Sequence, residues 1–319
     1  MSKRNRSAKT NASNGKITNI TQFFRHFGTE QQCEKYLFNK LYPDGFNCPV
    51  CGNKHCSKIN TRREYQCTKC SHQFSLIKGT VMENSKLSLS KWFLAAFLIT
   101  NDKRGISGMQ LARELEVCDK TAYFMLQRLR SAMVYEGRMN VLSSEIELDD
   151  AYVGTSKSGS KRGRGCDKVP FIAAVEKGKK GGCAMRATSD LTAKTFKEFA
   201  RDFICKNSHI RTDGFVSLKS GLASWPGLDS KVFSTSDNDS SLRCVHHIIS
   251  NFKAFIVGTY HGVSKRWMQS YMDEFSWRYK NRHNRSSFLL LIDDMCKWHC
   301  KRKNLIKLFA PQSASMVAA

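Results

Sequence analysis

The sequence predicts a multidomain α+β protein, in which a metal-bound ribbon and a pair of helices precede an α/β domain. Two Cys-x-x-Cys pairs lie in the first quarter of the chain. Residues 107–133 repeat apolar side chains at helical spacing, whereas residues 143–154 and 209–214 resemble strands that deliver an aspartate to their ends. With 319 residues, the chain is long enough for two or three domains with sizeable cores.

The charge of the chain is strongly basic. Lys and Arg total 52 against 27 acidic residues, a formal net charge of +25. Such an excess favours a polyanionic partner through phosphate contacts and counterion release. Charge alone also fits a ribosome-associated or a membrane-surface protein.

The chain contains 13 cysteines. No secretory signal pattern begins it, and no run of about 18 apolar residues predicts a membrane span. We therefore expect a cytoplasmic protein with reduced thiols and no membrane partner.

Residues 1–18 form a basic, polar tail that we expect to be disordered and solvated rather than a specific DNA arm. Residues 19–80 are predicted to form a zinc-ribbon domain. Its four candidate ligands are two cysteine pairs separated by fifteen residues: Cys48, Cys51, Cys67 and Cys70. This spacing is typical of a four-thiolate structural Zn²⁺ site, which stabilises a segment too small to bury its own core. Unligated thiols or a redox pair are the alternatives, and the ribbon itself could contact DNA or protein.

Residues 81–138 have the pattern of a helix-turn-helix region, with Ser107 as the cap of its first helix. In the DNA-binding form, the N-terminal end of the second helix enters the major groove. Three residues would then approach bases: Lys120, Thr121 and Tyr123. Two further residues would meet phosphates or solvent: Arg128 and Arg130. A plain helical hairpin fits the same pattern.

Residues 139–285 are predicted to form an α/β catalytic domain, followed by a C-terminal helix and tail over 286–319. Period two places Glu147 and Asp149 on one face of a strand. A second strand ends at Asp213, where Gly214 permits a turn. Carboxylates at strand ends are suited to a metal ion.

A Gly- and Ser-rich loop after the Asp149 strand carries basic residues that include Lys161, Arg162 and Arg164. It could grip a phosphate backbone or be merely solvated, and both interpretations stay open. Further along, residues 245–263 read as a helix with one apolar stripe. Asn251 lies at one edge of that stripe and Lys253 at the other, because residues two apart on a helix do not share a face.

These segments resemble a known family, the bacterial insertion-sequence transposases with an N-terminal zinc ribbon and an RNase H-like catalytic domain. The matching motifs occur in the family's order between about residues 30 and 282: CPVCG, GTVMENSKLSLSKW, ELDDAYVG, TDGF, ISNFKAFIVGTYHGVSKRW and YMDEFSWRY. The resemblance implies an RNase H-like α/β core with a mixed sheet. In the family's Asp-Asp-Asn-Lys branch of DDE-type enzymes, it assigns the catalytic positions to Asp149, Asp213, Asn251 and Lys253.

The implied chemistry uses two Mg²⁺ or Mn²⁺ ions, which activate an oxygen nucleophile and stabilise the leaving oxygen. Asp149 would bridge both ions, Asp213 would hold one, and Asn251 would offer a neutral oxygen to the other. Lys253 would contact a phosphate. Glu274 is the rival to Asn251 as third ligand, and the residues alone would favour it.

Three histidines accompany these positions in the same part of the chain, and we interpret them as polar residues rather than bases: His246, His247 and His261. In two-metal chemistry the ions themselves lower the pKa of the attacking water.

The resemblance implies a DNA transposase that binds the ends of its insertion sequence, cleaves DNA and transfers a 3′-hydroxyl to target DNA. Its partners would be double-stranded DNA, as terminal repeats and target, and further copies of the chain in a dimer or larger assembly. The protein would be associated with the nucleoid when bound. The alternative is a non-catalytic zinc-ribbon DNA-binding regulator derived from a transposase, and a third hypothesis is a structure-selective nuclease that cuts but never joins.

Overall fold

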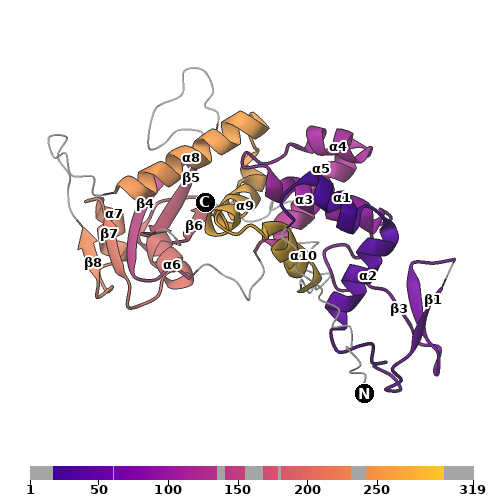
Figure 1. Cartoon of the computed structure of the whole chain (residues 1–319). Helices are drawn as coiled ribbons and strands as arrows, with labels where there is room; N and C mark the ends of the chain where they lie inside the picture. The colour runs from indigo at the N-terminus through magenta and orange to yellow at the C-terminus, as the bar shows by residue number, and fades with distance from the viewer. Residues whose placement is uncertain are drawn as a thin grey trace, which may run out of the picture.

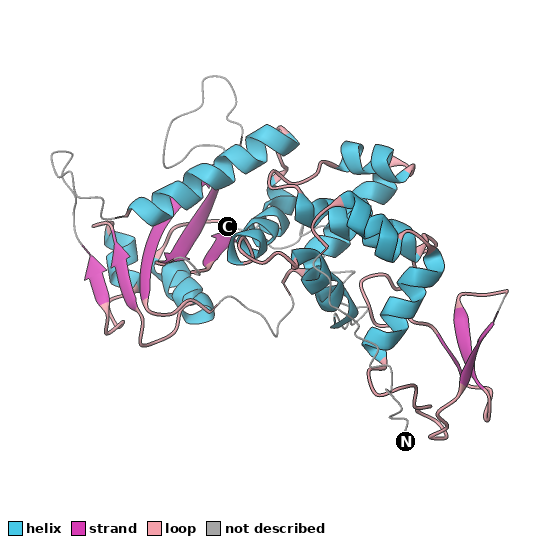
Figure 2. Ribbon diagram, in the orientation of Figure 1, coloured by secondary structure: helices cyan, strands magenta, loops and turns pink. Residues whose placement is uncertain are grey.

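The fold was analysed in a computed structural model of the chain. It describes residues 17–59, 61–134, 141–154, 168–178, 181–230 and 242–297. Nearly all of the predicted tail and the basic residues Lys161, Arg162 and Arg164 lie outside these ranges. Figure 2 shows strands in two separate places, a five-stranded sheet and a small ribbon, with a group of helices between them.

The ribbon is a three-stranded antiparallel sheet in the order β1-β2-β3. Its strands are β1 (Cys56–Ile59), β2 (Glu64–Cys67) and β3 (Gln73–Phe74). Phe46 stacks on Phe74 with ring centroids 4.8 Å apart, and Tyr65 packs against the same ring. These few aromatic contacts are a small core, which agrees with the prediction that a metal stabilises this segment.

The helical region contains five helices from the first half of the chain and one from its C-terminal part. Their bounds are α1 (Ile20–Phe27), α2 (Glu30–Leu41), α3 (Leu89–Asn101), α4 (Gly108–Leu115), α5 (Asp119–Ala132) and α10 (Ser287–Lys297). Local signals begin several of them: Thr29 and Gln32 form a capping box at α2, and Ser107 caps α4 as predicted. Phe288, Leu291 and Ile292 of α10 are buried in the same core as α3 and α5, so the chain returns to its first helices.

The larger sheet has the order β6-β5-β4-β7-β8. Its strands are β4 (Glu145–Val153), β5 (Val169–Glu176), β6 (Cys183–Ala187), β7 (His209–Thr212) and β8 (Leu228–Ser230). β4 is central, antiparallel to β5 and parallel to β7, and the sheet is therefore mixed, as predicted. The strand carrying Asp149 thus lies beside the strand that ends before Asp213.

Helices cover both faces of this sheet, as Figure 1 shows. They are α6 (Ala193–Phe203), α7 (Val216–Gly221), α8 (Arg243–Tyr260) and α9 (Met268–Lys280), with a 3₁₀ turn, η2 (Lys265–Trp267), before α9. Alternation along β4 decides which face each residue joins. Ile146 and Leu148 pack with α6, whereas Ala151 and Val153 pack with α8 and α9. No helix in the described ranges is both long and apolar enough to cross a membrane.

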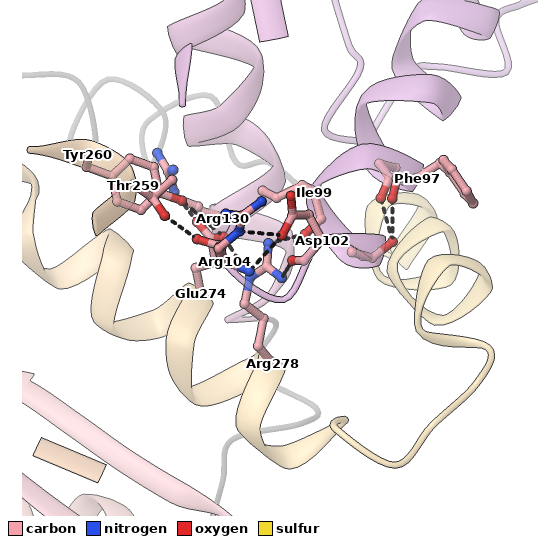
Figure 3. A network of polar contacts seen from close by, with 11 residues as sticks. Phe97, Ile99, Asp102, Arg104, Arg130, Thr259, Tyr260, Glu274 and Arg278 are labelled. Carbon is pink, nitrogen blue, oxygen red and sulfur yellow. Dashed lines mark hydrogen bonds and ion pairs between the residues drawn. The ribbon is translucent and has the colours of Figure 1, made fainter. Parts of the chain in front are cut away.

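A buried ion-pair network joins the helical region to the sheet domain (Figure 3). The Glu274 carboxylate on α9 is fully buried and lies 2.7 Å from Arg130 Nε on α5 and 2.8 Å from Arg278 Nε. Burial opposes ionisation, but the two arginine charges outweigh it and lower the pKa of Glu274. The Arg130 guanidinium also lies 3.8 Å from the centroid of the Tyr271 ring.

Side chains of α8 and α9 also donate hydrogen bonds to backbone carbonyl groups at the end of α3 and in the loop that follows it. Arg278 donates to the carbonyl oxygens of Ile99 and Asp102, and Thr259 Oγ1 donates to the carbonyl of Arg104 at 2.6 Å. Buried carbonyls need donors. The loop after α3 therefore depends on α8 and α9 for its hydrogen bonds.

We predict that Glu274→Gln lowers the free energy of unfolding by about 3–5 kcal/mol, because it leaves the buried Arg130 and the mostly buried Arg278 without a countercharge. Urea denaturation followed by tryptophan fluorescence measures this change. Arg104→Ala is the control, because its side chain is 86% exposed and its pair with Asp102 should contribute less than about 1 kcal/mol. Equal stability of Glu274→Gln and wild type would contradict the role assigned to this network.

Candidate functional site

The four predicted zinc ligands come together at one end of the ribbon. The sulfur atoms of Cys48, Cys51, Cys67 and Cys70 all lie within 4.8 Å of one another. Cys48 Sγ is 3.6 Å from Cys70 Sγ, and Cys51 Sγ is 3.6 Å from Cys67 Sγ. A tetrahedral ion with Zn–S bonds of about 2.3 Å requires sulfur atoms about 3.8 Å apart. The donor set and its spacing therefore fit a structural Zn²⁺ site.

Neighbouring N–H groups support this cluster. Asn53 Nδ2 donates to Cys67 Sγ at 3.5 Å, and the amide of Lys69 donates to the same sulfur at 3.4 Å. These donors favour a thiolate, the form that binds metal.

The two predicted catalytic aspartates lie at the same level of neighbouring parallel strands. Glu147 pairs with Arg211 in the β4–β7 register, and Asp149 and Asp213 are each two residues further along. Asp213 follows the end of β7 as predicted, whereas Asp149 lies in the middle of β4, because this strand continues to Val153 in its pairing with β5. The backbone around Asp213 is held by its own turn, in which the Phe215 amide donates to Asp213 Oδ1 at 3.1 Å, and by Ser230 Oγ, which donates to its carbonyl at 2.9 Å. The sheet thus brings together two acids that are 64 positions apart in the sequence.

The Asp149 carboxylate is mostly buried, and its environment disfavours ionisation. Burial is the main reason why the pKa of Asp149 is raised to about 6, and the nearby carboxylates of Asp150 and Asp213 contribute to the rise. A cation bound among these acids would relieve both effects. This electrostatic arrangement fits a metal site.

The residue that contacts Asp149 from α8 is His246. Its Nε2 atom lies 3.2 Å from Asp149 Oδ2, and its side chain is 62% exposed, which leaves the ring accessible from solvent. Our sequence interpretation treated this histidine as an ordinary polar residue and expected Asn251 at the metal. In this structure it is His246, not Asn251, that is in contact with Asp149.

Helix geometry explains why His246 and Asn251 cannot both face Asp149. Asn251 follows His246 by five residues, which is about 140° around the helix axis. Val245, Ile248 and Phe252 face the sheet, so His246 and Asn251 lie on opposite flanks of α8. Lys253 follows His246 by seven residues, about 20° around the axis and about 10.5 Å along it, and shares its flank. The sequence signal that could have pointed to His246 is its seven-residue spacing from Lys253, which places both side chains on one flank of a helix.

Glu274, the rival candidate for third ligand, is engaged in ion pairs, which does not support that assignment. Each of its carboxylate oxygens is paired with an arginine, and its side chain is 0% exposed. The reason is tertiary: α9 turns this residue towards α5.

Residues expected to contact DNA fall into two groups. Lys120 and Tyr123 are exposed at the start of α5, and Thr121 is partly exposed there, as a recognition helix requires. Arg128 and Arg130 are buried, which corrects their assignment to phosphates. Arg128 donates to the carbonyls of Val81 and Glu83, and Arg130 pairs with Glu274, because the second half of α5 faces the protein core.

Comparisons with known proteins agree with this architecture. Residues 141–280 match the family model of the ISXO2-like transposase domain, and residues 28–73 match that of the transposase zinc-ribbon domain. A protein in transposable element ISH50 of Halobacterium salinarum, described as uncharacterized, is 29% identical over 170 residues, 48% of this chain and 56% of that protein. The chain therefore spans just over half the length of this relative.

Solved structures of the Mos1 transposase are remotely similar. A pre-cleavage transpososome matches with a TM-score of 0.27 and 12% identity over 63% of this chain and 78% of that chain. A strand transfer complex matches with a TM-score of 0.29 and 11% identity over 64% and 78%. The family models, not these structures, confirm the resemblance inferred from the sequence motifs.

We predict that purified protein contains about one Zn²⁺ per chain and that Cys67→Ser loses it, because a tetrahedral site lacks a ligand without this thiolate. Inductively coupled plasma mass spectrometry measures the metal content. Cys56→Ser is the matched control, since Cys56 pairs with Cys67 across the β1–β2 ladder but does not belong to the cluster. Retention of zinc by Cys67→Ser would contradict the assignment.

Proposed function

Because the chain joins a transposase zinc ribbon to an ISXO2-like transposase domain, we propose that it is the transposase of an insertion sequence. In this proposal the protein binds the ends of its element, cleaves the DNA phosphodiester and transfers a 3′-hydroxyl to target DNA. The observation that carries the catalytic part is the position of Asp149 in the middle of β4, beside the end of β7 where Asp213 follows, with His246 3.2 Å from Asp149.

Asp149, Asp213 and His246 would hold the catalytic divalent ions, with Asp149 central because His246 contacts it and Asp213 is near it on the neighbouring strand. Ions bound there would lower the pKa of the attacking hydroxyl and stabilise charge on the leaving oxygen. Asp149 and Asp213 offer the carboxylate oxygens that Mg²⁺ and Mn²⁺ prefer. The imidazole of His246 is a softer ligand that suits Mn²⁺ better than Mg²⁺.

Lys253 is proposed to contact a DNA phosphate. It is exposed on the same flank of α8 as His246, about two helical turns further along. A flexible ammonium group at that distance suits a phosphate beside the reacting one rather than the metal ligands. Asn251, on the opposite flank, receives no role at the metal in this proposal.

DNA recognition is proposed for the exposed start of α5, where Lys120, Thr121 and Tyr123 lie. An N-terminal turn of a second helix is the part that enters a major groove in helix-turn-helix proteins. The net charge of +25 supports binding to DNA. Joining two element ends requires both to be held together, which supports a dimer or larger assembly on DNA.

We predict that Asp149→Ala, Asp213→Ala and His246→Ala each lower the rate of cleavage and strand transfer by at least about 100-fold, more than outer-shell residues usually contribute. The assay uses purified protein, DNA from the flanks of its own gene, and Mg²⁺ or Mn²⁺. His246→Asn should retain part of the Mg²⁺-supported rate, because its amide oxygen is a harder ligand than imidazole.

Asn251→Ala is the matched control for His246→Ala and should stay within a few-fold of wild type. Inactivation by Asn251→Ala with full activity of His246→Ala would restore Asn251 as the third ligand. Specific DNA binding without any cleavage, unchanged by Asp149→Ala, would favour the non-catalytic regulator instead. Cleavage without joining would indicate a nuclease.

We predict that Lys120→Ala weakens binding to element-end DNA and lowers the slope of log K against log salt concentration by about 1, because an ammonium group in the groove also neutralises about one phosphate charge. Fluorescence anisotropy at several salt concentrations measures both quantities. Arg113→Ala, an exposed basic residue near the end of α4, is the control and should leave the slope unchanged. An identical slope for Lys120→Ala and wild type would remove α5 from the interface.

A further inference from the structure

The first turn of α8 is held by a side chain from the central strand. Glu147 Oε2 accepts the amide of Cys244 at 2.7 Å and the amide of Val245 at 3.0 Å. The first amides of a helix have no partner within the helix. The residue at the cap position, Leu242, has an apolar side chain that cannot accept a hydrogen bond, so Glu147 supplies the cap from β4.

Each oxygen of the Glu147 carboxylate faces a positive charge or the positive end of a dipole. Glu147 is only 1% exposed, and a buried carboxylate needs compensating charge or dipoles. The positive end of the α8 dipole faces one oxygen. Lys177 Nζ lies 3.5 Å from the other oxygen, and the Lys177 amide donates to the carbonyl of Glu145 at 2.9 Å. Both oxygens of Glu147 are therefore constrained.

This cap lies directly beside the proposed catalytic contact. Glu147 and Asp149 are two residues apart on one face of β4, and Val245 and His246 are consecutive on α8. The strand and the helix thus meet at two adjacent points, Glu147 with Val245 and Asp149 with His246. The contact of Glu147 with Val245 therefore restrains the position of α8 along the sheet and its rotation at the next residue, His246.

Resting on the proposed function, we propose that Glu147 is a positioning residue, which aligns α8 so that His246 faces Asp149 and Lys253 faces the same flank. Apolar packing alone does not set this alignment. Val245, Ile248 and Phe252 attach α8 to the sheet, but hydrophobic contact is non-directional and tolerates small shifts of a helix along the sheet. The two amide bonds to Glu147 specify one register.

The first test measures the cap without requiring activity. Hydrogen–deuterium exchange, in zinc-loaded protein without added Mg²⁺ or Mn²⁺, reports on peptides that span residues 242–250. Glu147→Ala should increase exchange at the amides of Cys244 and Val245 by about 10-fold or more, since hydrogen bonds to charged acceptors are the strong ones. Glu145→Ala is the matched control, because its carboxylate lies on the same face 3.6 Å from Lys177 but does not bind α8.

The second test measures positioning. Glu147→Ala should lower the strand-transfer rate by about 10- to 100-fold, the usual effect of groups that orient metal ligands, while DNA affinity stays unchanged. Glu147→Gln should fall between wild type and Glu147→Ala, because its amide oxygen can still accept both α8 amides although the charge is lost. This variant also carries the test if Glu147→Ala does not fold.

Two results would overturn the proposal. One is unchanged exchange of the α8 amides in Glu147→Ala and Glu147→Gln; the other is faster exchange with a wild-type rate of strand transfer. An inactive wild-type protein would contradict the proposed function rather than the cap, since the exchange measurement still decides whether Glu147 holds α8. Slower strand transfer together with faster exchange, and neither in Glu145→Ala, is the expected result.

Discussion

The buried carboxylate of Glu274, held between Arg130 and Arg278, is the interaction on which the arrangement of this protein depends. Arg130 comes from α5 of the helical region, whereas Glu274 and Arg278 come from α9, which packs beside β6 of the sheet. Glu274 and Arg278 pair within α9, whereas Arg130 is fully buried and finds its countercharge only when both parts are docked. The network therefore joins α5 to α9.

The path of the chain strengthens this coupling. After α9 completes the sheet domain, α10 returns to the first helices and buries Phe288, Leu291 and Ile292 among them. The two parts are thus joined by the chain, by a shared apolar core and by the ion pairs shown in Figure 3. A DNA segment bound at α5 and a phosphodiester at Asp149 would then lie at a defined separation, which suits an enzyme that cuts at a fixed place relative to a recognised end.

At the candidate site, the sheet positions the two aspartates, and α8 positions His246. The β4–β7 register brings Asp149 and Asp213 to one level, and this follows from backbone hydrogen bonds alone. The contact of His246 with Asp149 depends on how α8 lies across the sheet, and Glu147 accepts two amides at the start of this helix. The capping carboxylate of Glu147 and the carboxylate of the proposed metal site at Asp149 are thus neighbours on one strand.

The sequence by itself determined the features that rest on local rules. Thiolate spacing predicted the ribbon site, Ser107 predicted a helix start, and period two predicted which face of β4 carries Asp149. Tertiary structure decided the contacts of His246, Glu274, Arg128 and Arg130. These four residues lie on helices, where a side chain's partner depends on which flank packs against which element. An acid on one face of a strand or a cysteine pair needs only its neighbours in sequence to be recognised, whereas a helical residue acquires its role from contacts across the fold, which residue type and spacing constrain only weakly.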